Sequence, residues 1–365
     1  MTTDRRYDID WLRVIAIGLL LIYHIAIVFQ PWAMLLAFIR SNTLLEGLWK
    51  PMTLLNVWRI PLLFFVSGMG VYFALRQRNW KQLLMERSKR ILLPFLFGIV
   101  AMTPLHMYVF QAYYHLPLNY YAHMGHLWFL GNIFVYVLLL LPLFLYLKKQ
   151  ETSGFKSGLS KLMGHPAGPL LLTVPFILET LLVQPQLFAL YAETWHGFFI
   201  GLLAFFFGFL ILYSGVAFWQ TVSKWWGLYL ALAAVLFAVR YMVYATEAPG
   251  ALMAIESNAW IFTVFGLGYR YLNRPSQRLS YLSRAAYPVY IIHMVVLYVG
   301  AMLILPLDLP PFLTFLGLTG FTFLGCFVGY ELLRRVVLLR PLFGLPWRLK
   351  TKHPVALSVP EDARP

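Results

Sequence analysis

The sequence has 365 residues, of which 61% are apolar and only 12% are charged, against roughly 45–50% and 25% in soluble domains. This composition excludes an ordinary soluble enzyme and indicates a membrane protein with room for about ten spanning helices. The formal charge of +15 does not indicate a nucleic-acid partner, because the basic residues lie in short runs between apolar segments, as in cytoplasmic loops.

Ten apolar segments follow one another along the chain, each about as long as a helix needs to cross a bilayer. Pro, Gly, aromatic and charged residues separate them, as is typical of membrane interfaces, and no segment alternates like a barrel strand. The sequence therefore predicts an all-α integral membrane protein with about ten transmembrane helices. The segments are roughly 11–30, 52–75, 91–111, 126–147, 169–188, 196–214, 225–244, 253–272, 285–305 and 313–337.

The distribution of basic residues predicts the orientation. With the N-terminus in the cytoplasm, only Arg40, Lys50, Arg59 and Arg240 of the 29 Lys and Arg residues fall on the outer side. Positive residues favour the cytoplasmic side, so both termini are expected to be cytoplasmic.

The chain is expected to form one transmembrane domain over residues 1–350, followed by a disordered cytoplasmic tail at 351–365. Its first segment is expected to be an uncleaved span, because the apolar stretch is too long for a signal peptide and no small-residue cleavage site follows. Gln150 to Gly168, rich in Gly, Ser and Lys, is expected to be the longest linker.

Arg13 and His24 are eleven residues apart in the first segment, about three helical turns, so both point the same way about 16 Å apart along the axis. Arg13 would sit at the charged mouth of the span and His24 near its middle. An ionisable group at that depth is a functional candidate, and a neutral imidazole suits a general base. The alternatives are a histidine bonded to a neighbouring helix, and a positive-inside anchor in which Arg13 pairs with Asp10 three residues before it.

Arg87 and Arg90 precede the third apolar segment and are expected to share one helical face at the cytoplasmic boundary. Their planar guanidinium groups suit phosphate oxygens. A topology signal or a lipid-headgroup contact explains them equally well.

His126 and Trp128 open the fourth segment at the outer face. An aromatic ring there suits a sugar acceptor, and an interfacial belt is the alternative. His123 and His126 without further ligands do not make a metal site, and the single cysteine, Cys326, excludes a cysteine metal cluster and a disulfide framework. We expect no metal.

Glu256 begins the eighth segment, near the outer face, where it could orient a histidine or accept a proton; a solvated helix N-terminus is the alternative. Tyr287, Tyr290 and His293 are spaced by three in the ninth segment and line one side of its helix. Hydrogen bonding between helices is the alternative to catalysis for His293.

Taken in order, these motifs resemble acyltransferase family 3, the membrane acyltransferases that modify cell-surface and periplasmic carbohydrates. The closest likeness is to the glucan biosynthesis protein C branch, which is associated with succinylation of periplasmic glucans. The resemblance runs from about Tyr7 to Trp347. It is carried by Asp10-Trp11-Leu12-Arg13 with His24, Arg87-x-x-Arg90, His126-Leu127-Trp128-Phe129-Leu130, Glu256-Ser257, Tyr290-Ile291-Ile292-His293 and Arg340-Pro341-Leu342-Phe343-Gly344.

The resemblance implies a multi-pass protein of the bacterial inner membrane, surrounded by membrane lipids. It implies that a short acyl group, acetyl or succinyl, passes from cytoplasmic acyl-CoA to a hydroxyl of a periplasmic glucan or surface polysaccharide. His24 would be the general base, with Glu256 and His293 as further catalytic candidates. Arg13, Arg87 and Arg90 would hold acyl-CoA, and the residues expected to contact the substrate are Asp10, His126, Trp128 and Tyr290.

Two other functions fit the same residues. A proton-coupled transporter or flippase of a glycan or small organic acid would use His24 and Glu256 to relay protons, although no paired broken helices appear in the two halves. A non-catalytic membrane sensor or scaffold would not depend on His24.

Overall fold

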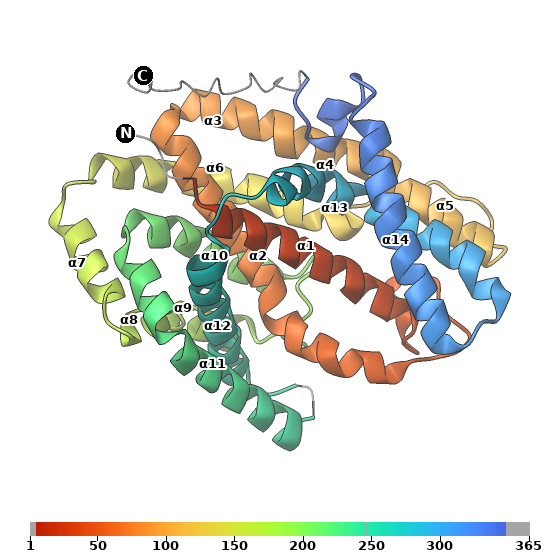
Figure 1. The fold of residues 1–365 in the computed structure, drawn as a ribbon, viewed down its shortest axis with the longest axis horizontal. Helices are drawn as coiled ribbons and strands as arrows, with labels where there is room; N and C mark the ends of the chain where they lie inside the picture. Colours follow the sequence, from red (N-terminus) through yellow and green to blue (C-terminus); the bar gives the residue numbers. More distant parts are fainter. Residues whose placement is uncertain (1–4, 246, 348–365) are drawn as a thin grey trace, which may run out of the picture.

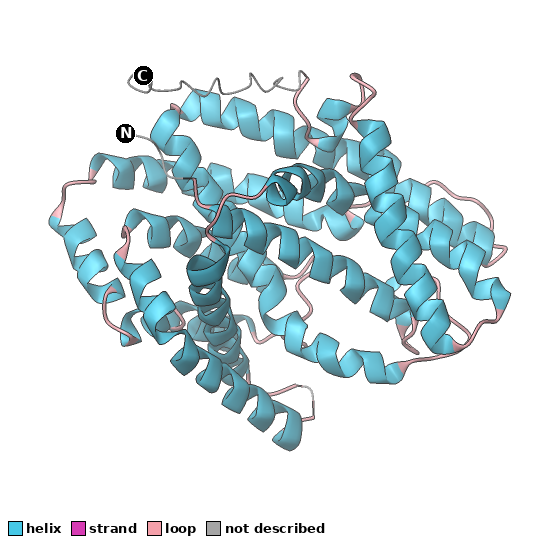
Figure 2. Cartoon of the chain, in the orientation of Figure 1, coloured by secondary structure: helices cyan, strands magenta, loops and turns pink. Residues whose placement is uncertain are grey.

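The computed structural model describes residues 5–245 and 247–347, and these residues form helices and loops without a strand (Figure 2). Within them, nine helical segments are long and apolar enough to cross a membrane, or ten if one bent pair is a single span. The prediction of an all-α membrane protein with about ten spans is confirmed. The predicted tail at 351–365 lies outside the described residues.

The observed helices follow the predicted segments in order, and several predicted spans begin earlier in the structure. The long helices are α1 (Tyr7–Val28), α2 (Trp49–Gln77), α6 (Trp128–Lys149), α10 (Trp195–Tyr213), α11 (Ala217–Val243), α12 (Gly250–Leu267), α13 (Gln277–Ile304) and α14 (Pro311–Leu333). The shorter ones are α3 (Trp80–Arg87), α4 (Leu93–Phe97), α5 (Thr103–Tyr113), α7 (Gly154–Met163), α8 (Ala167–Leu171) and α9 (Val174–Val183).

The predicted linker from Gln150 to Gly168 is not a loop, because α7 occupies most of it. Ser153 caps this helix by accepting a hydrogen bond from the backbone N–H of Lys156 at 3.5 Å. The chain then bends by 109° into the segment Ala167–Val183. Pro166 and Pro169 flank this bend, and proline cannot donate the hydrogen bonds that would continue the helix of α7.

A buried ion pair joins the bent segment to the rest of the bundle. Nδ1 of His196 in α10 lies 3.0 Å from both carboxylate oxygens of Glu179 in α9, and Nε2 of His196 lies 2.9 Å from the carbonyl oxygen of Phe188. Both ring nitrogens of His196 therefore lie at hydrogen-bond distance from oxygen atoms. The pair holds α9 against α10 together with the apolar contact between Phe176 and Phe207, whose ring centres are 5.8 Å apart.

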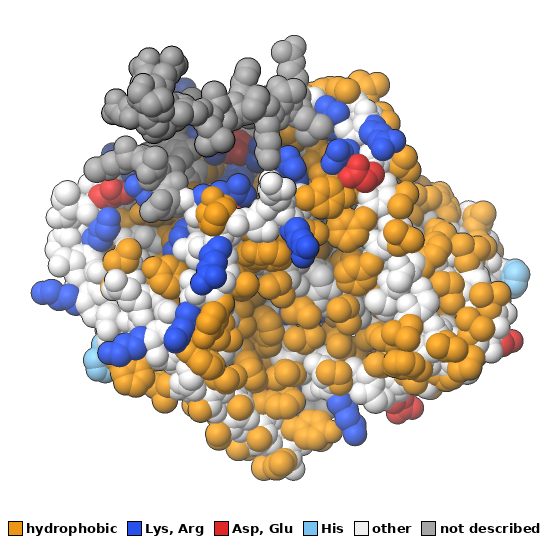
Figure 3. Space-filling model, in the orientation of Figure 1, with side chains coloured by type: hydrophobic (Ala, Val, Ile, Leu, Met, Phe, Trp, Pro, Cys, Tyr) orange, Lys and Arg blue, Asp and Glu red, His pale blue; other side chains and the backbone are white. Residues whose placement is uncertain are grey.

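Helix α1 occupies the centre of the bundle and packs against α2 and α13 (Figure 1). Helix α2 also packs against α10, and α13 against α14. Lys and Arg side chains gather mainly over the upper and left part of the view in Figure 3, whereas apolar side chains cover much of the centre and lower right. We call the end of the bundle that carries Arg13, Arg76 and Arg87 the basic end.

Helices α2 and α10 approach each other through small residues, as expected where backbones meet in a membrane. A Cβ atom at Gly68 of α2 would lie 1.9 Å from the carbonyl oxygen of Phe205, and one at Gly208 of α10 would lie 2.0 Å from that of Phe65. Each glycine therefore admits the backbone of the other helix, and no side chain fits at either position.

We expect Gly68→Val and Gly208→Val each to lower the free energy of unfolding by about 3 kcal/mol or more, because the new methyl groups would force the two backbones apart. The measurement is thermal unfolding of the purified protein in detergent. Gly227→Val on α11 is the matched control, since nothing lies within 4 Å of a Cβ there. Equal unfolding temperatures for the three variants would contradict this packing.

Candidate functional site

Four histidines from distant parts of the sequence meet inside the bundle: His24 of α1, His106 of α5, His126 at the start of α6 and His293 of α13. The ring centres of His24 and His293 are 5.1 Å apart with nearly parallel planes, and those of His126 and His293 are 4.9 Å apart. The rings of His106 and His126 are 6.1 Å apart. We call these four side chains the histidine cluster.

A hydrogen-bonded chain fixes the tautomer of His24. Nδ1 of His293 lies 2.7 Å from the carbonyl oxygen of Tyr290, which can only accept, so Nδ1 donates. In a neutral His293 the other nitrogen, Nε2, then accepts from Nδ1 of His24 at 2.8 Å. A neutral His24 is left with an unprotonated Nε2, which has no hydrogen-bond partner among the described residues. The residue is half-buried, and a nitrogen lone pair without a partner can accept a hydrogen bond from a ligand.

His126 is held in the cluster by α13. The hydroxyl of Tyr290 donates to the backbone carbonyl of His126, and Nε2 of His126 donates to the carbonyl oxygen of Ile291 at 3.2 Å. Its Nδ1 is therefore an acceptor, and it is buried without a partner. The cluster thus presents at least two nitrogens that accept hydrogen bonds, on His24 and His126, and such nitrogens suit a ligand that carries hydroxyl groups.

Sequence reasoning missed His106, which is 3% exposed within the third apolar segment. The depth argument that selected His24 applies equally to this residue. His123 lies beside it, with ring centres 5.9 Å apart, and burial lowers the pKa of the His123 imidazole, so this ring is neutral at pH 7. Within the described residues no three His, Cys, Asp or Glu side chains are arranged to hold a metal ion.

The position of His24 along α1 differs from the expected one. It lies four residues before Val28, the last residue of α1, about 6 Å from that end of the helix at 1.5 Å per residue. It is therefore nearer the C-terminal end of the helix than its middle, because α1 begins at Tyr7, earlier than the apolar segment itself. Phe38, from the loop after α1, has its ring centre 5.7 Å from that of His24.

A cavity of about 260 Å³ lies at the basic end between α1 and α2. Arg13 borders it and pairs with Asp10 at 3.6 Å, as their spacing predicts. Arg5 also binds Asp10, at 2.8 Å. The cavity is lined by Arg5, Arg6, Ile9, Asp10, Arg13, Gly70, Phe73, Arg76 and Gln77. Four arginines and one aspartate give this cavity an excess of positive charge.

Arg87 and Arg90 do not share a helical face. The chain is π-helical over Ser88–Leu92, and a π-turn holds more residues than an α-turn, which changes the relative direction of side chains three apart. Arg87 points inward and donates to the carbonyl oxygen of Gly70 at 3.1 Å, at the lining of the cavity, while its buried Nε has no partner. Arg90 is exposed and pairs with Glu86 at 3.3 Å.

The cavity at the basic end and the histidine cluster are separated by packed apolar side chains. The lining of the cavity reaches Arg13 but does not include His24. Between these two residues, α1 buries Ile17, Leu20 and Leu21. A ligand that reaches from one site to the other therefore requires the packing along this part of α1 to open.

A family model described as an acyltransferase domain matches residues 6–331. The chain belongs to acyltransferase family 3. The search of curated proteins and the search of solved structures gave no match. The protein is therefore a membrane acyltransferase, and the matched region contains the histidine cluster, all the predicted site residues and the lining of the basic cavity except Arg5.

Two predicted site residues of this acyltransferase, Glu256 and Trp128, belong neither to the histidine cluster nor to the basic end. Glu256 of α12 is fully buried and binds Arg240 of α11 through both oxygens, at 2.7 and 2.9 Å. Arg240 also donates to the backbone carbonyl of Thr53 in α2 at 3.0 Å. Glu256 therefore joins three helices. Trp128 is buried, and its ring centre lies 6.0 Å from that of Phe64 in α2.

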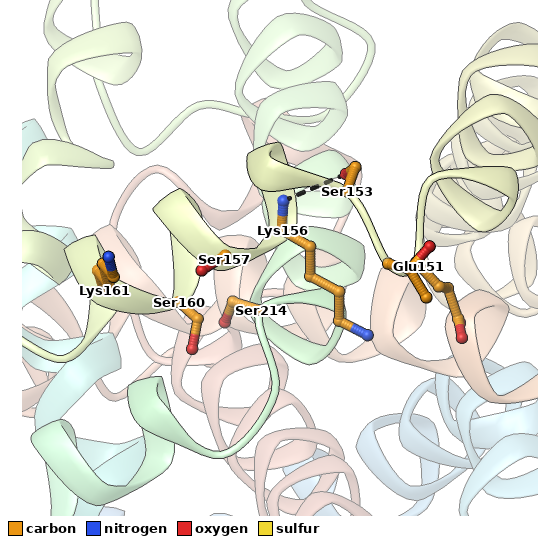
Figure 4. Close-up of a pocket in the computed structure, with 8 residues that line it drawn as sticks. Glu151, Ser153, Lys156, Ser157, Ser160, Lys161 and Ser214 are labelled. Atoms are coloured by element: carbon orange, nitrogen blue, oxygen red, sulfur yellow. Dashed lines mark hydrogen bonds between the residues drawn. The ribbon is translucent and has the colours of Figure 1, made fainter.

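A second hollow, of about 410 Å³, lies beside α7 (Figure 4). Serine and lysine side chains of α7 line it together with Ser214, and it contains none of the predicted site residues. Its lining is Glu151, Thr152, Ser153, Lys156, Ser157, Ser160, Lys161 and Ser214. This surface offers no imidazole, so the histidine cluster remains the site that fits acyl transfer.

The Arg240–Glu256 pair yields a prediction about stability. We expect Glu256→Leu alone to lower the free energy of unfolding by about 3–5 kcal/mol, because it leaves a buried guanidinium without its counter-ion. Arg240→Met with Glu256→Leu removes both charges and should recover much of this loss. The measurement is thermal unfolding of the single and double variants in detergent. A double variant less stable than the single one would contradict a mainly electrostatic role.

Proposed function

We propose that this protein transfers a short acyl group, acetyl or succinyl, from acyl-CoA to a hydroxyl of a carbohydrate. The acceptor would be a periplasmic glucan or a surface polysaccharide, as in the glucan biosynthesis protein C branch, and the membrane the bacterial inner membrane. The observation that carries the proposal is the chain of contacts from the carbonyl oxygen of Tyr290 through His293 to Nδ1 of His24, from which an unprotonated Nε2 on a neutral His24 follows.

The chemistry follows from this tautomer. Nε2 of His24 accepts the proton of the acceptor hydroxyl, while the oxygen of that hydroxyl forms a bond to the thioester carbonyl carbon. The carbon–sulfur bond then breaks, and the protonated imidazole returns the proton to the sulfur, so that coenzyme A leaves as the thiol. His293 acts as a positioning residue, because it holds Nδ1 of His24 and favours the imidazolium that forms.

The basic end fits the anionic donor. Arg13 and Arg87 border or approach one cavity, and the unpartnered Nε of Arg87 leaves a donor for a phosphate oxygen. Arg90, which is more exposed, would contact the part of coenzyme A that lies outside the cavity. The pantetheine arm would then pass along α1 towards His24, over the roughly 16 Å between residues 13 and 24, as the packing there opens.

The opposite end fits the carbohydrate. His24 and His126 offer acceptor nitrogens to hydroxyl groups, and Tyr290 holds His126 in place. With both termini in the cytoplasm, as the distribution of basic residues predicts, this end would face the periplasm. Glu256 would have a structural role, because both its oxygens bind Arg240, and Arg240 in turn binds α2. The same pairing weighs against a transporter in which Glu256 and His24 relay protons.

We expect His24→Ala to lower the rate of acyl transfer by about 10²–10⁴-fold, because the general base is lost. The measurement is transfer of label from acyl-CoA to a glucan by the purified protein, with thermal unfolding to confirm that the variant folds. His115→Ala, which removes an exposed histidine outside the cluster, is the control. Wild-type activity in a folded His24→Ala variant would contradict the mechanism.

We expect Arg87→Ala to raise the KM for acyl-CoA about tenfold or more with little change in kcat, because a charged hydrogen bond to a phosphate is worth about 1.5–3 kcal/mol. Arg278→Ala removes an exposed arginine of α13 and controls for overall charge. An unchanged KM in Arg87→Ala would exclude this arginine from the coenzyme site.

A further inference from the structure

Arg59 of α2 is an arginine buried inside the bundle without a counter-ion. Its side chain is 1% exposed, and no carboxylate of the described residues forms an ion pair with it. Its one hydrogen bond runs from an Nη to the carbonyl oxygen of Leu19 at 3.4 Å, and Nε is buried without a partner. Arg240 is equally buried, but Glu256 neutralises it.

The position of Arg59 connects it to the histidine cluster. Its guanidinium carbon lies 4.1 Å from the centre of the Tyr23 ring, and the Tyr23 ring centre lies 5.7 Å from that of His24. The two separations limit the distance between the guanidinium and the His24 ring to about 10 Å. Leu19, the other contact of Arg59, is on the side of His24 that faces the basic end, where the donor would arrive.

A second unpartnered donor lies next to Arg59 in the sequence. Nε1 of Trp58 is also buried without a hydrogen-bond partner. Guanidinium and indole N–H groups can only donate, and an unsatisfied donor in the interior is costly. The guanidinium of Arg59, which also carries a positive charge, therefore suits an oxygen that carries negative charge and that a substrate brings.

We propose that Arg59 binds the carbonyl oxygen of the thioester and stabilises the negative charge that develops on it during acyl transfer. This role rests on the proposed function. When the acceptor oxygen bonds to the carbonyl carbon and His24 takes its proton, the carbonyl electron pair moves onto oxygen. It returns to re-form the carbonyl as the carbon–sulfur bond breaks, and the sulfur leaves with the proton from His24.

The separation of the two groups suits this role. A tetrahedral carbon with a hydrogen bond of about 2.8 Å at each of two oxygens spans roughly 7 Å between the imidazole nitrogen and the guanidinium nitrogen. The same arrangement can also be measured from the centre of the His24 ring to the guanidinium carbon of Arg59. That distance stays within the limit of about 10 Å that the two Tyr23 contacts set. The positive charge lies in a site shielded from water, where it acts most strongly on developing negative charge.

The test compares Arg59→Met and Arg59→Lys with the wild type in transfer from labelled acetyl-CoA to a glucan. We expect Arg59→Met to lower kcat by about 10²–10³-fold and Arg59→Lys to recover part of this loss. Binding of ethyl-CoA, a thioether that lacks the carbonyl oxygen, should be the same in Arg59→Met and wild type. Arg59→Met should also unfold at the same temperature as the wild type or higher, whereas Arg240→Met should unfold at a lower one.

Each contrary result is distinct. An unchanged kcat in Arg59→Met, or weaker binding of ethyl-CoA, would overturn the role of Arg59 and leave the proposed function standing. If Arg59→Met lost succinyl transfer but kept normal acetyl transfer, Arg59 would instead bind the carboxylate of the succinyl group, and its role at the thioester carbonyl would be overturned. No transfer from acetyl-CoA or succinyl-CoA by the wild-type protein would overturn the proposed function together with this inference.

Discussion

The hydrogen bond between His24 and His293 is the interaction on which the site depends. It joins two helices that are far apart in sequence, and the carbonyl oxygen of Tyr290 gives it a direction, because that oxygen can only accept. A neutral imidazole pair costs far less at this depth than a charged group would. The pair therefore provides a base, His24, that is uncharged at rest. The contacts of His293 determine that the unprotonated nitrogen of His24 is Nε2.

Some of the buried polar groups without a hydrogen-bond partner lie where the proposed substrates would bind. Donors without partners occur on Arg87 and Arg59, towards the basic end and beside the cluster, and an acceptor without a partner occurs on His126. Other buried groups of the same kinds are paired, as in Arg240 with Glu256 and in His196 with Glu179. Buried polar atoms without a partner also occur on α11, α12 and α14, so a missing partner supports a binding role only where the surrounding residues fit the substrate.

The sequence predicts the spans well because hydrophobic length is a local property. It also selects His24, His126, Tyr290 and His293, which the structure brings together. It does not reveal the partner of Glu256 or the environment of Arg59, since both depend on packing between helices. The inward direction of Arg87 was equally hidden, because the π-turn after it has no simple sequence signal.

The central claim is that His24 rests as a neutral imidazole with its proton on Nδ1 and a free lone pair on Nε2. Solid-state ¹⁵N NMR of the histidine-labelled protein in lipid bilayers at pH 7.5 tests it directly, with His24→Gln to assign the signals. We expect one protonated nitrogen, Nδ1, and one unprotonated nitrogen, Nε2, for this ring. A proton on Nε2, or an imidazolium, would contradict it.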